Sequence, residues 1–211
     1  MNFLVVVVNI LALDLGTQTG WSMSQNGIIT SGSKSFATNN LAGRGVRFMN
    51  FRNWLLDCFA SSDIDFVAFE QVKRHIGTYA AHVYGGFLAQ LTSVCEEKHI
   101  PYKGYGVKTI KKFITGSGNA SKQDVINAVE TKGYKPIDDN ESDSIAILLL
   151  AQSESVKESR VMYIENKESS NDKNLNSIDV DDAQVKNRLG KDNDNKHEIF
   201  TGPFKYSQVT G

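Results

Sequence analysis

The feature that most constrains the fold is a change of apolar pattern along residues 1–151. Three short apolar runs come first, at residues 4–13, 21–23 and 27–30, and they predict an antiparallel three-stranded meander. Further strands, at residues 64–69 and 101–107, then alternate with segments of helical periodicity. A meander followed by such alternation predicts an α/β fold, in which a mixed sheet with antiparallel and parallel strands is flanked by helices.

Helical spacing of apolar residues predicts five helices in this part of the chain. They span residues 44–59, 78–98, 108–114 and 122–132, and a last helix begins near Asp143. Apolar periodicity then ends near Ala151, and residues 152–211 are predicted to form a polar, largely disordered tail. Charge does not mark this boundary, because residues 1–151 carry 14 basic and 13 acidic residues and the tail carries 9 and 11.

Composition limits the class of protein without identifying it. The 23 Lys and Arg balance 24 Asp and Glu, so net charge alone does not indicate a nucleic-acid-binding protein. The two cysteines, Cys58 and Cys95, have no metal-ligand or redox spacing and fit buried thiols in a reducing compartment. No segment has the roughly 18 to 20 uninterrupted apolar residues of a membrane helix. We therefore expect a soluble intracellular protein without a membrane partner.

Three acids stand where an otherwise buried element ends or begins: Asp14 after the first apolar run, Glu70 after residues 64–69, and Asp143 at the last helix. A carboxylate in such a place is costly unless it binds a cation or pairs with a base. Oxygen ligands without His or Cys favour Mg²⁺ or Mn²⁺ over zinc. We predict two shared Mg²⁺ ions, replaceable by Mn²⁺, that activate a water for phosphodiester hydrolysis.

Each acid taken alone has a simpler interpretation. Asp14 fits an ordinary turn, Asp143 fits a helix N-cap, and Glu70 fits an ion pair with Lys73 or Arg74. The metal interpretation therefore depends on all three acids acting together.

A basic strip covers residues 73–122, which contain eight Lys and Arg against two acids. Such a strip can neutralise DNA phosphates beside an acidic active site, although a solvated surface is the simpler explanation. The glycine-rich segment 116–120 precedes a predicted helix N-terminus, which favours a phosphate. The residues predicted to bind DNA are Lys73, Arg74, Lys108, Lys111, Lys112 and Lys122.

Four segments, in order, resemble the signature blocks of the RuvC family of Holliday junction resolvases, particularly its phage-type members. They are LDLGTQTGW at residues 13–21, FEQV at 69–72, VK at 107–108 with TGSGNASKQDV at 115–125, and NESDSIA at 140–146. The resemblance implies a ribonuclease-H-like fold, a homodimer, and paired nicks in four-way or branched DNA in the cytoplasm of a prokaryotic or phage-infected cell. It assigns Asp14, Glu70 and Asp143 as metal ligands, and Lys108 and Lys122 as the basic residues nearest the scissile phosphate, with Lys122 taking part in catalysis.

The chain departs from the family pattern at two positions. Asn140 stands where bacterial members often carry a fourth acid or a histidine; its amide oxygen can ligate Mg²⁺, and Asp139 and Glu141 are the alternatives. Lys73 stands where the bacterial pattern has an aromatic residue that opens the junction, and the possible substitutes are His75 and Tyr79.

Two other functions fit part of the pattern. LDLGTQTG also resembles the first phosphate loop of actin-like ATPases and sugar kinases, but these enzymes need two such lobes, which about 150 folded residues cannot supply. A non-catalytic junction-binding protein of the same fold is the other alternative, and Asn140 is its clue.

Overall fold

The computed structural model describes residues 8–39, 43–73 and 77–155. These residues form a five-stranded sheet in the order β3-β2-β1-β4-β5. The strands are β1 (Ile10–Asp14), β2 (Gln18–Gln25), β3 (Ile28–Ser35), β4 (Phe66–Gln71) and β5 (Tyr102–Gly106). The first three pair antiparallel, whereas β4 and β5 continue the sheet parallel to β1. The predicted mixed sheet is thereby confirmed.

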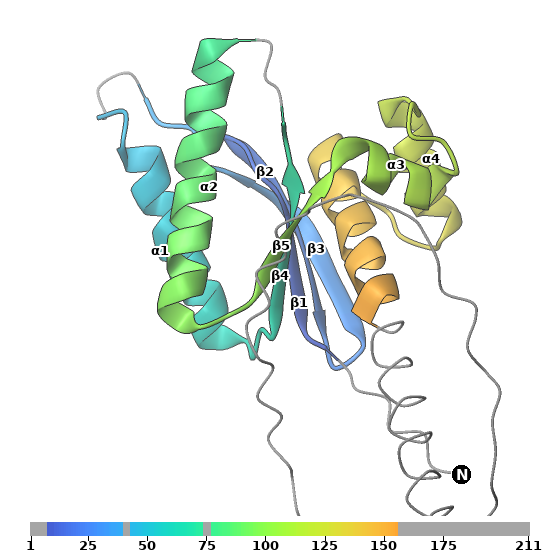
Figure 1. Cartoon of the computed structure of the whole chain (residues 1–211), viewed down its shortest axis with the longest axis horizontal. Coiled ribbons are helices and arrows are strands. Elements are labelled where there is room, and N and C mark those ends of the chain that lie inside the picture. The colour runs from blue at the N-terminus through green and yellow to red at the C-terminus, as the bar shows by residue number, and fades with distance from the viewer. Residues whose placement is uncertain (1–7, 40–42, 74–76, 156–211) are drawn as a thin grey trace, which may run out of the picture. The chain divides into compact units, whose positions relative to one another are not determined.

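Helices cover both faces of this sheet (Figure 1). The helices α1 (Val46–Ser61) and α2 (Thr78–Lys98) lie on one face, and α3 (Val107–Thr115) and α4 (Lys122–Thr131) lie on the other. A final helix, described over residues 139–155, packs on the same face as α3 and α4. None of the helices within the described ranges is long and apolar enough to cross a membrane.

The central strand β1 is buried on both sides, which explains why its sequence is continuously apolar. Leu11 and Leu13 face a core that α1 and α2 complete, and the alternate residues Ile10 and Ala12 face a second core completed by α3, α4 and the final helix. Successive side chains of a strand point to opposite faces. Asp14, which follows Ala12 in this alternation, therefore lies on the face of the final helix.

The same alternation places Glu70. In β4, Val67 and Phe69 belong to the core under α1 and α2, whereas Ala68 belongs to the core under the final helix. Glu70 follows Ala68 by two residues, so it lies on the same face as Asp14. The fold thus brings two of the predicted metal ligands to one face and one end of the sheet.

The final helix begins at residue 139, so the expectation that it starts near Asp143 was wrong. Asp143 lies inside the helix and is not its N-cap. The helix continues through residue 155, beyond the predicted domain boundary at Ala151. Residues 156–211, which make up most of the predicted tail, lie outside the described residues, and the disorder of the tail stays a prediction.

Both cysteines are free thiols. Cys95 is fully buried in the core beneath α2, and Cys58 is half-buried on α1. Burial, reinforced by a neighbouring acid, raises the pKa of Cys95 to about 12 and that of Cys58 to about 11. Neither thiol is therefore activated as a nucleophile.

Candidate active site

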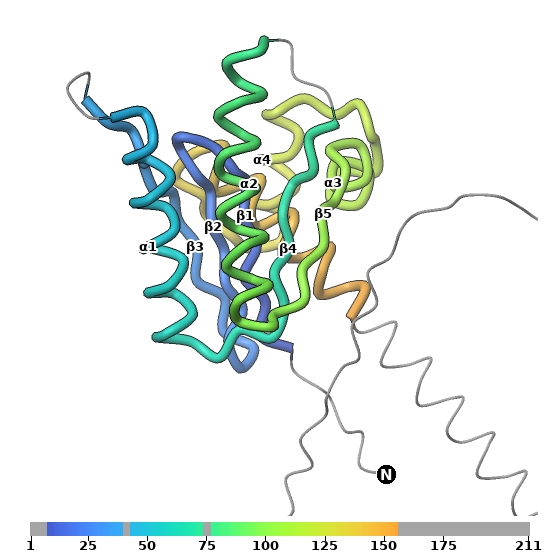
Figure 2. The backbone as a smooth tube through the Cα atoms, turned by 60° about the vertical axis from the view of Figure 1, so that its left-hand side comes forward, coloured from blue at the N-terminus to red at the C-terminus, as the bar shows by residue number. Residues whose placement is uncertain are grey.

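Asp14 and Glu70 lie side by side at the ends of two parallel strands. Leu13 of β1 pairs with Phe69 of β4, and each acid is the next residue along its strand. Figure 2 shows β1 and β4 as neighbours in the centre of the sheet. Neighbouring parallel strands that end at the same edge place these two carboxylates on one rim of the sheet.

The electrostatics show that Asp143 joins this pair. Burial raises the pKa of Asp14 to about 8, and the charges of Glu70 and Asp143 add to the rise. The pKa of Glu70 is likewise raised to about 7, mainly by burial and further by the charge of Asp143. The pKa of Asp143 is also raised, first by burial. Each acid is thus half-buried and close enough to the others for their charges to interact.

Among the residues that the structure describes, no three His, Cys, Asp or Glu side chains lie close enough together to hold a metal ion as they stand. The chemistry of the donors nevertheless fits a divalent cation. Half-buried carboxylates close to one another are unfavourable as separate charges, and a shared cation relieves both the burial and the repulsion. Such binding requires the side chains to turn toward a common point.

The final helix carries Asp143 and is held against β2 by close backbone packing and polar contacts. Gly20, the partner of Asp14 in the β1–β2 ladder, lies against the helix backbone at Asn140. Further along, the buried Ser22 hydroxyl donates to the carbonyl oxygen of Ser144 over 2.8 Å. These contacts fix the height of Asp143 above the sheet.

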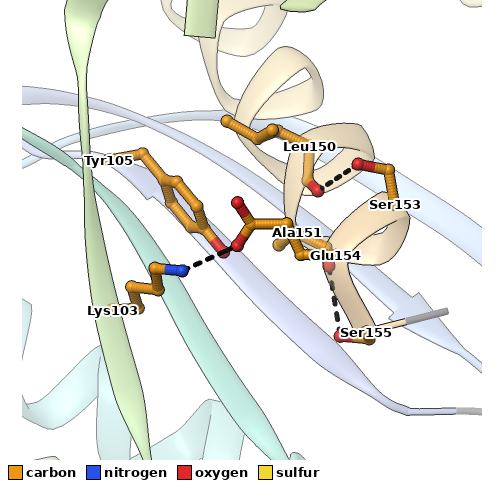
Figure 3. A network of polar contacts seen from close by, with 7 residues as sticks. All are labelled: Lys103, Tyr105, Leu150, Ala151, Ser153, Glu154 and Ser155. Atoms are coloured by element: carbon orange, nitrogen blue, oxygen red, sulfur yellow. Dashed lines mark hydrogen bonds and ion pairs between the residues drawn. The ribbon is translucent and has the colours of Figure 1, made fainter. Parts of the chain in front are cut away.

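A second group of contacts fixes the far end of the same helix (Figure 3). The Lys103 ammonium and the Tyr105 hydroxyl, both on the edge strand β5, each donate to Glu154 Oε2 over 2.8 Å. The Lys103 ammonium also lies 5.1 Å from the centre of the Tyr105 ring, within range of a cation–π interaction. The helix is therefore anchored at both ends, which limits the freedom of Asp143.

Glu141 has a structural role. Its side chain is 6% exposed, and its carboxylate accepts hydrogen bonds from the Ser31 hydroxyl at 2.6 Å and from the backbone N–H of Ile137 at 2.7 Å. The Glu141 backbone N–H donates to the Asp138 carboxylate over 2.8 Å, so Asp138 caps the helix. Of the three alternatives for a fourth ligand, Glu141 is thus already committed to other partners.

Asp139 lies next to the acids and forms an ion pair with Lys122. The hydrogen bond from Lys122 lowers the pKa of Asp139, whose charge contributes to the raised pKa of both Asp14 and Asp143. Asn140, the position suggested by the family pattern, is half-buried in the same turn. Among the three alternatives for a fourth ligand, Asp139 is therefore the one whose charge acts on Asp14 and Asp143.

Lys111 and Lys122 supply positive charge to the acidic cluster. Burial raises the pKa of Asp143, and the charges of these two lysines oppose that rise. Lys111 also opposes the rise at Glu70, and its ammonium donates to the carbonyl oxygen of Ala120 over 2.6 Å. Sequence reasoning placed Lys122 at the site, but it assigned Lys111 only to DNA binding.

The remaining predicted DNA-binding residues lie further out or beyond the described ranges. Lys108 and Lys112 are exposed on α3, and Lys73 is exposed after β4. Arg74 and His75 lie outside the described residues. Tyr79 is 67% exposed at the start of α2, and its hydroxyl lies 3.3 Å from a donor nitrogen of Arg47.

Sequence reasoning missed Tyr84. Its hydroxyl donates to the carbonyl oxygen of Glu70 at 2.9 Å and accepts from the backbone N–H of Val72 at 3.2 Å. The tyrosine thus ties α2 to the end of β4 and holds the backbone that carries the Glu70 carboxylate. Its position at a buried helical spacing gave no sign of this role, because the same spacing fits ordinary core packing.

Comparison with known proteins identifies the fold. No protein-family model and no curated protein sequence matches the chain. The structure of Thermus thermophilus RuvC in complex with a Holliday junction substrate matches with a TM-score of 0.58 and 20% sequence identity, over 67% of this chain and 90% of that one. A second Thermus thermophilus RuvC structure matches with a TM-score of 0.56 and 21% identity, over 66% of this chain and 90% of that one.

Proposed function

We propose that this chain, which has the fold of RuvC, is a divalent-metal-dependent endonuclease that cuts four-way or otherwise branched DNA. The observation that carries the proposal is the electrostatic coupling of Asp14, Glu70 and Asp143, which come from three distant parts of the sequence. Structural likeness alone does not assign an activity. The proposal therefore depends on the acids themselves.

Asp14, Glu70 and Asp143 are the proposed ligands of two Mg²⁺ ions, for which Mn²⁺ can substitute. When bound, such ions lower the pKa of a water and stabilise the leaving oxygen of a phosphodiester. Asp139 is the proposed fourth ligand because its charge reaches two of these acids. The amide oxygen of Asn140 is the alternative.

The lysines have two proposed roles. Lys122 and Lys111 lie beside the acids, where they offset the repulsion between the acidic cluster and a DNA phosphate and stabilise charge that develops during cleavage. Lys73, Lys108 and Lys112 are exposed and suited to contact the flanking backbone. Tyr84 keeps Glu70 in place through the hydrogen bond that its hydroxyl donates to the Glu70 backbone carbonyl.

Homodimerisation through α2 belongs to the same proposal. The space beside Gly86 is occupied by the same chain, because a Cβ added at Gly86 would stand 2.5 Å from the Phe48 ring. A Cβ added at Gly85 would meet no atom within 4 Å, and Ala80 and Ala89 are exposed. Gly86 is thus used within the chain, whereas the small residues Ala80, Gly85 and Ala89 leave an exposed strip of α2 on which a second copy can pack closely.

The direct test is cleavage of a mobile four-way DNA junction by the full-length chain in Mg²⁺ or Mn²⁺. We expect paired nicks with the unmodified protein, none with Asp14→Asn, and undiminished cleavage with Asp63→Asn, which removes an exposed acid outside the cluster. Junction binding without cleavage in either metal would instead support the non-catalytic binding protein. Nucleotide hydrolysis without DNA cleavage would support the actin-like ATPase.

A further inference from the structure

The outer face of α3 exposes an aromatic side chain among lysines. Ile110 and Ile114 are buried against the final helix and α4, whereas Phe113 is 38% exposed. Lys108 and Lys112, which are also exposed, lie on the same outward side of the helix. Phe113 belongs to neither of the two cores formed by the described residues.

These residues line a shallow hollow of about 620 Å³ between α3 and the loop that follows it. Its lining consists of Lys108, Thr109, Lys112, Phe113, Gly118 and Asn119, with two cationic side chains and no acid. Gly118 lets the loop pass close to α3, because a Cβ there would lie 3.2 Å from the Lys108 carbonyl oxygen. The lining thus combines one aromatic ring, two cationic side chains and one side-chain amide.

This combination suits one class of ligand. A nucleobase offers a flat π-face that stacks on an exposed aromatic ring, and its flanking phosphates require positive charge. The hollow supplies both, because its lining contains the ring of Phe113 and the ammonium groups of Lys108 and Lys112. A purely apolar partner would not use the lysines.

We propose that Phe113 stacks on an unpaired nucleobase of the bound DNA while Lys108 and Lys112 bind the neighbouring phosphates. The choice of DNA as the occupant rests on the proposed endonuclease function. The same helix carries Lys111, whose charge reaches Glu70 and Asp143. The proposed stacking residue and a lysine that acts on the acids thus belong to one helix, and branched DNA supplies unstacked bases near its crossover.

The test uses the full-length chain in EDTA, so that binding is measured without cleavage. A single-stranded oligothymidylate and a four-way junction, each containing one 2-aminopurine, are titrated with protein, because this base loses fluorescence when it stacks. We expect quenching by the unmodified protein and by Phe113→Trp. Phe113→Leu should abolish the quenching and weaken binding of the oligothymidylate roughly 5- to 150-fold, as expected for the loss of one base–aromatic stack.

The matched control is Ile28→Ala, which removes an exposed apolar side chain, 70% accessible, from the first residue of β3 and should change neither signal. Lys112→Gln should preserve the quenching and reduce the salt dependence of binding by about one unit of slope. Equal quenching and affinity for Phe113→Leu and the unmodified protein would overturn the proposal. If Mg²⁺-dependent cleavage persisted in that case, the stacking proposal alone would fail and the proposed endonuclease function would stand. Quenching by Phe113 in a protein that cleaves no junction would instead contradict only the endonuclease function.

Discussion

Gly20 lies so close to the backbone of Asn140 that a Cβ added at Gly20 would stand 1.8 Å from the Asn140 carbonyl oxygen and 2.3 Å from its carbonyl carbon. Only a residue without a side chain fits there. The contact sets how near the final helix approaches β2, and the helix carries Asp143 three residues beyond Asn140. Gly20 is also the ladder partner of Asp14, so one glycine controls the spacing of two proposed ligands.

Gly20→Ala should therefore displace the final helix. We expect a loss of about 3 kcal/mol in the free energy of unfolding, at the upper end of the range for overpacking, and loss of junction cleavage. Urea denaturation measures the first effect. The control is Gly45→Ala just before α1, where φ is −79° and the new Cβ meets nothing within 4 Å, and it should change stability by less than about 1 kcal/mol. Wild-type stability and cleavage in Gly20→Ala would refute this packing.

Asp14 should make the metal-free protein less stable as the pH rises. Burial, with the charges of Glu70 and Asp143, raises its pKa from 3.8 to about 8 in the folded chain. Between these pH values the folded chain keeps a proton that the unfolded chain has released, so stability present below pH 4 is lost with a slope of at most about 1.4 kcal/mol per pH unit.

The variant Asp14→Asn cannot lose this proton. In EDTA, its free energy of unfolding should exceed that of the unmodified protein by more at pH 8 than at pH 5, and Mg²⁺ should stabilise only the unmodified protein strongly at pH 8. Urea denaturation at both pH values measures the difference. If the free energy of unfolding depended on pH in the same way for both proteins, the pKa of Asp14 would not be raised by burial and by neighbouring charges.

Lys111 and Lys108 should differ in effect although both are lysines of α3. Lys111→Gln removes a charge that acts on Glu70 and Asp143, so the cleavage rate should fall by about 100-fold with little change in junction affinity. Lys108→Gln removes an exposed charge and should weaken binding mainly through its salt dependence. Single-turnover cleavage and binding at several salt concentrations separate the two. Equal rates for both variants would contradict the assignment.

Glu141 and Asp139 should also separate into a structural and a metal-binding acid. Glu141→Gln alters a buried carboxylate that accepts from Ser31 and Ile137, and should cost roughly 1–3 kcal/mol of stability. Asp139→Asn should leave stability nearly unchanged and raise the Mg²⁺ concentration needed for half-maximal cleavage. A loss of stability in Asp139→Asn together with a higher Mg²⁺ requirement in Glu141→Gln would contradict the assignment of both acids.

The elements of the fold were predictable because their signals are local. Residues 10–13 of the apolar run before Asp14 are buried on both faces, and such burial requires a continuous apolar sequence. The helix at residues 78–98 was predicted with the bounds that the structure shows. The start of the final helix was missed because Asp138 and Asn140 resemble turn residues. Asp138 followed by Glu141 is the spacing of a helix cap and was the available signal.

The details of the site depended on contacts that sequence spacing does not encode. Lys108 and Lys111 are both plausible by position, and only the packing of α3 brings Lys111 toward the acids. Glu141 and Asp139 are both carboxylates near Asp143 in sequence. Only the hydrogen bond from the Ser31 hydroxyl on β3 reveals that the Glu141 carboxylate already has a partner. The close approach of Gly20 and the backbone contact of Tyr84 are likewise tertiary.

The most direct test of the account is the position of Mn²⁺ in crystals of the full-length chain soaked in manganese, located by anomalous scattering. We expect two peaks about 3.5 to 4 Å apart, each within about 2.0 to 2.3 Å of carboxylate oxygens drawn from Asp14, Glu70 and Asp143. Carboxylates that point apart, with no anomalous peak between them at saturating Mn²⁺, would contradict the shared metal site on which the proposed nuclease depends.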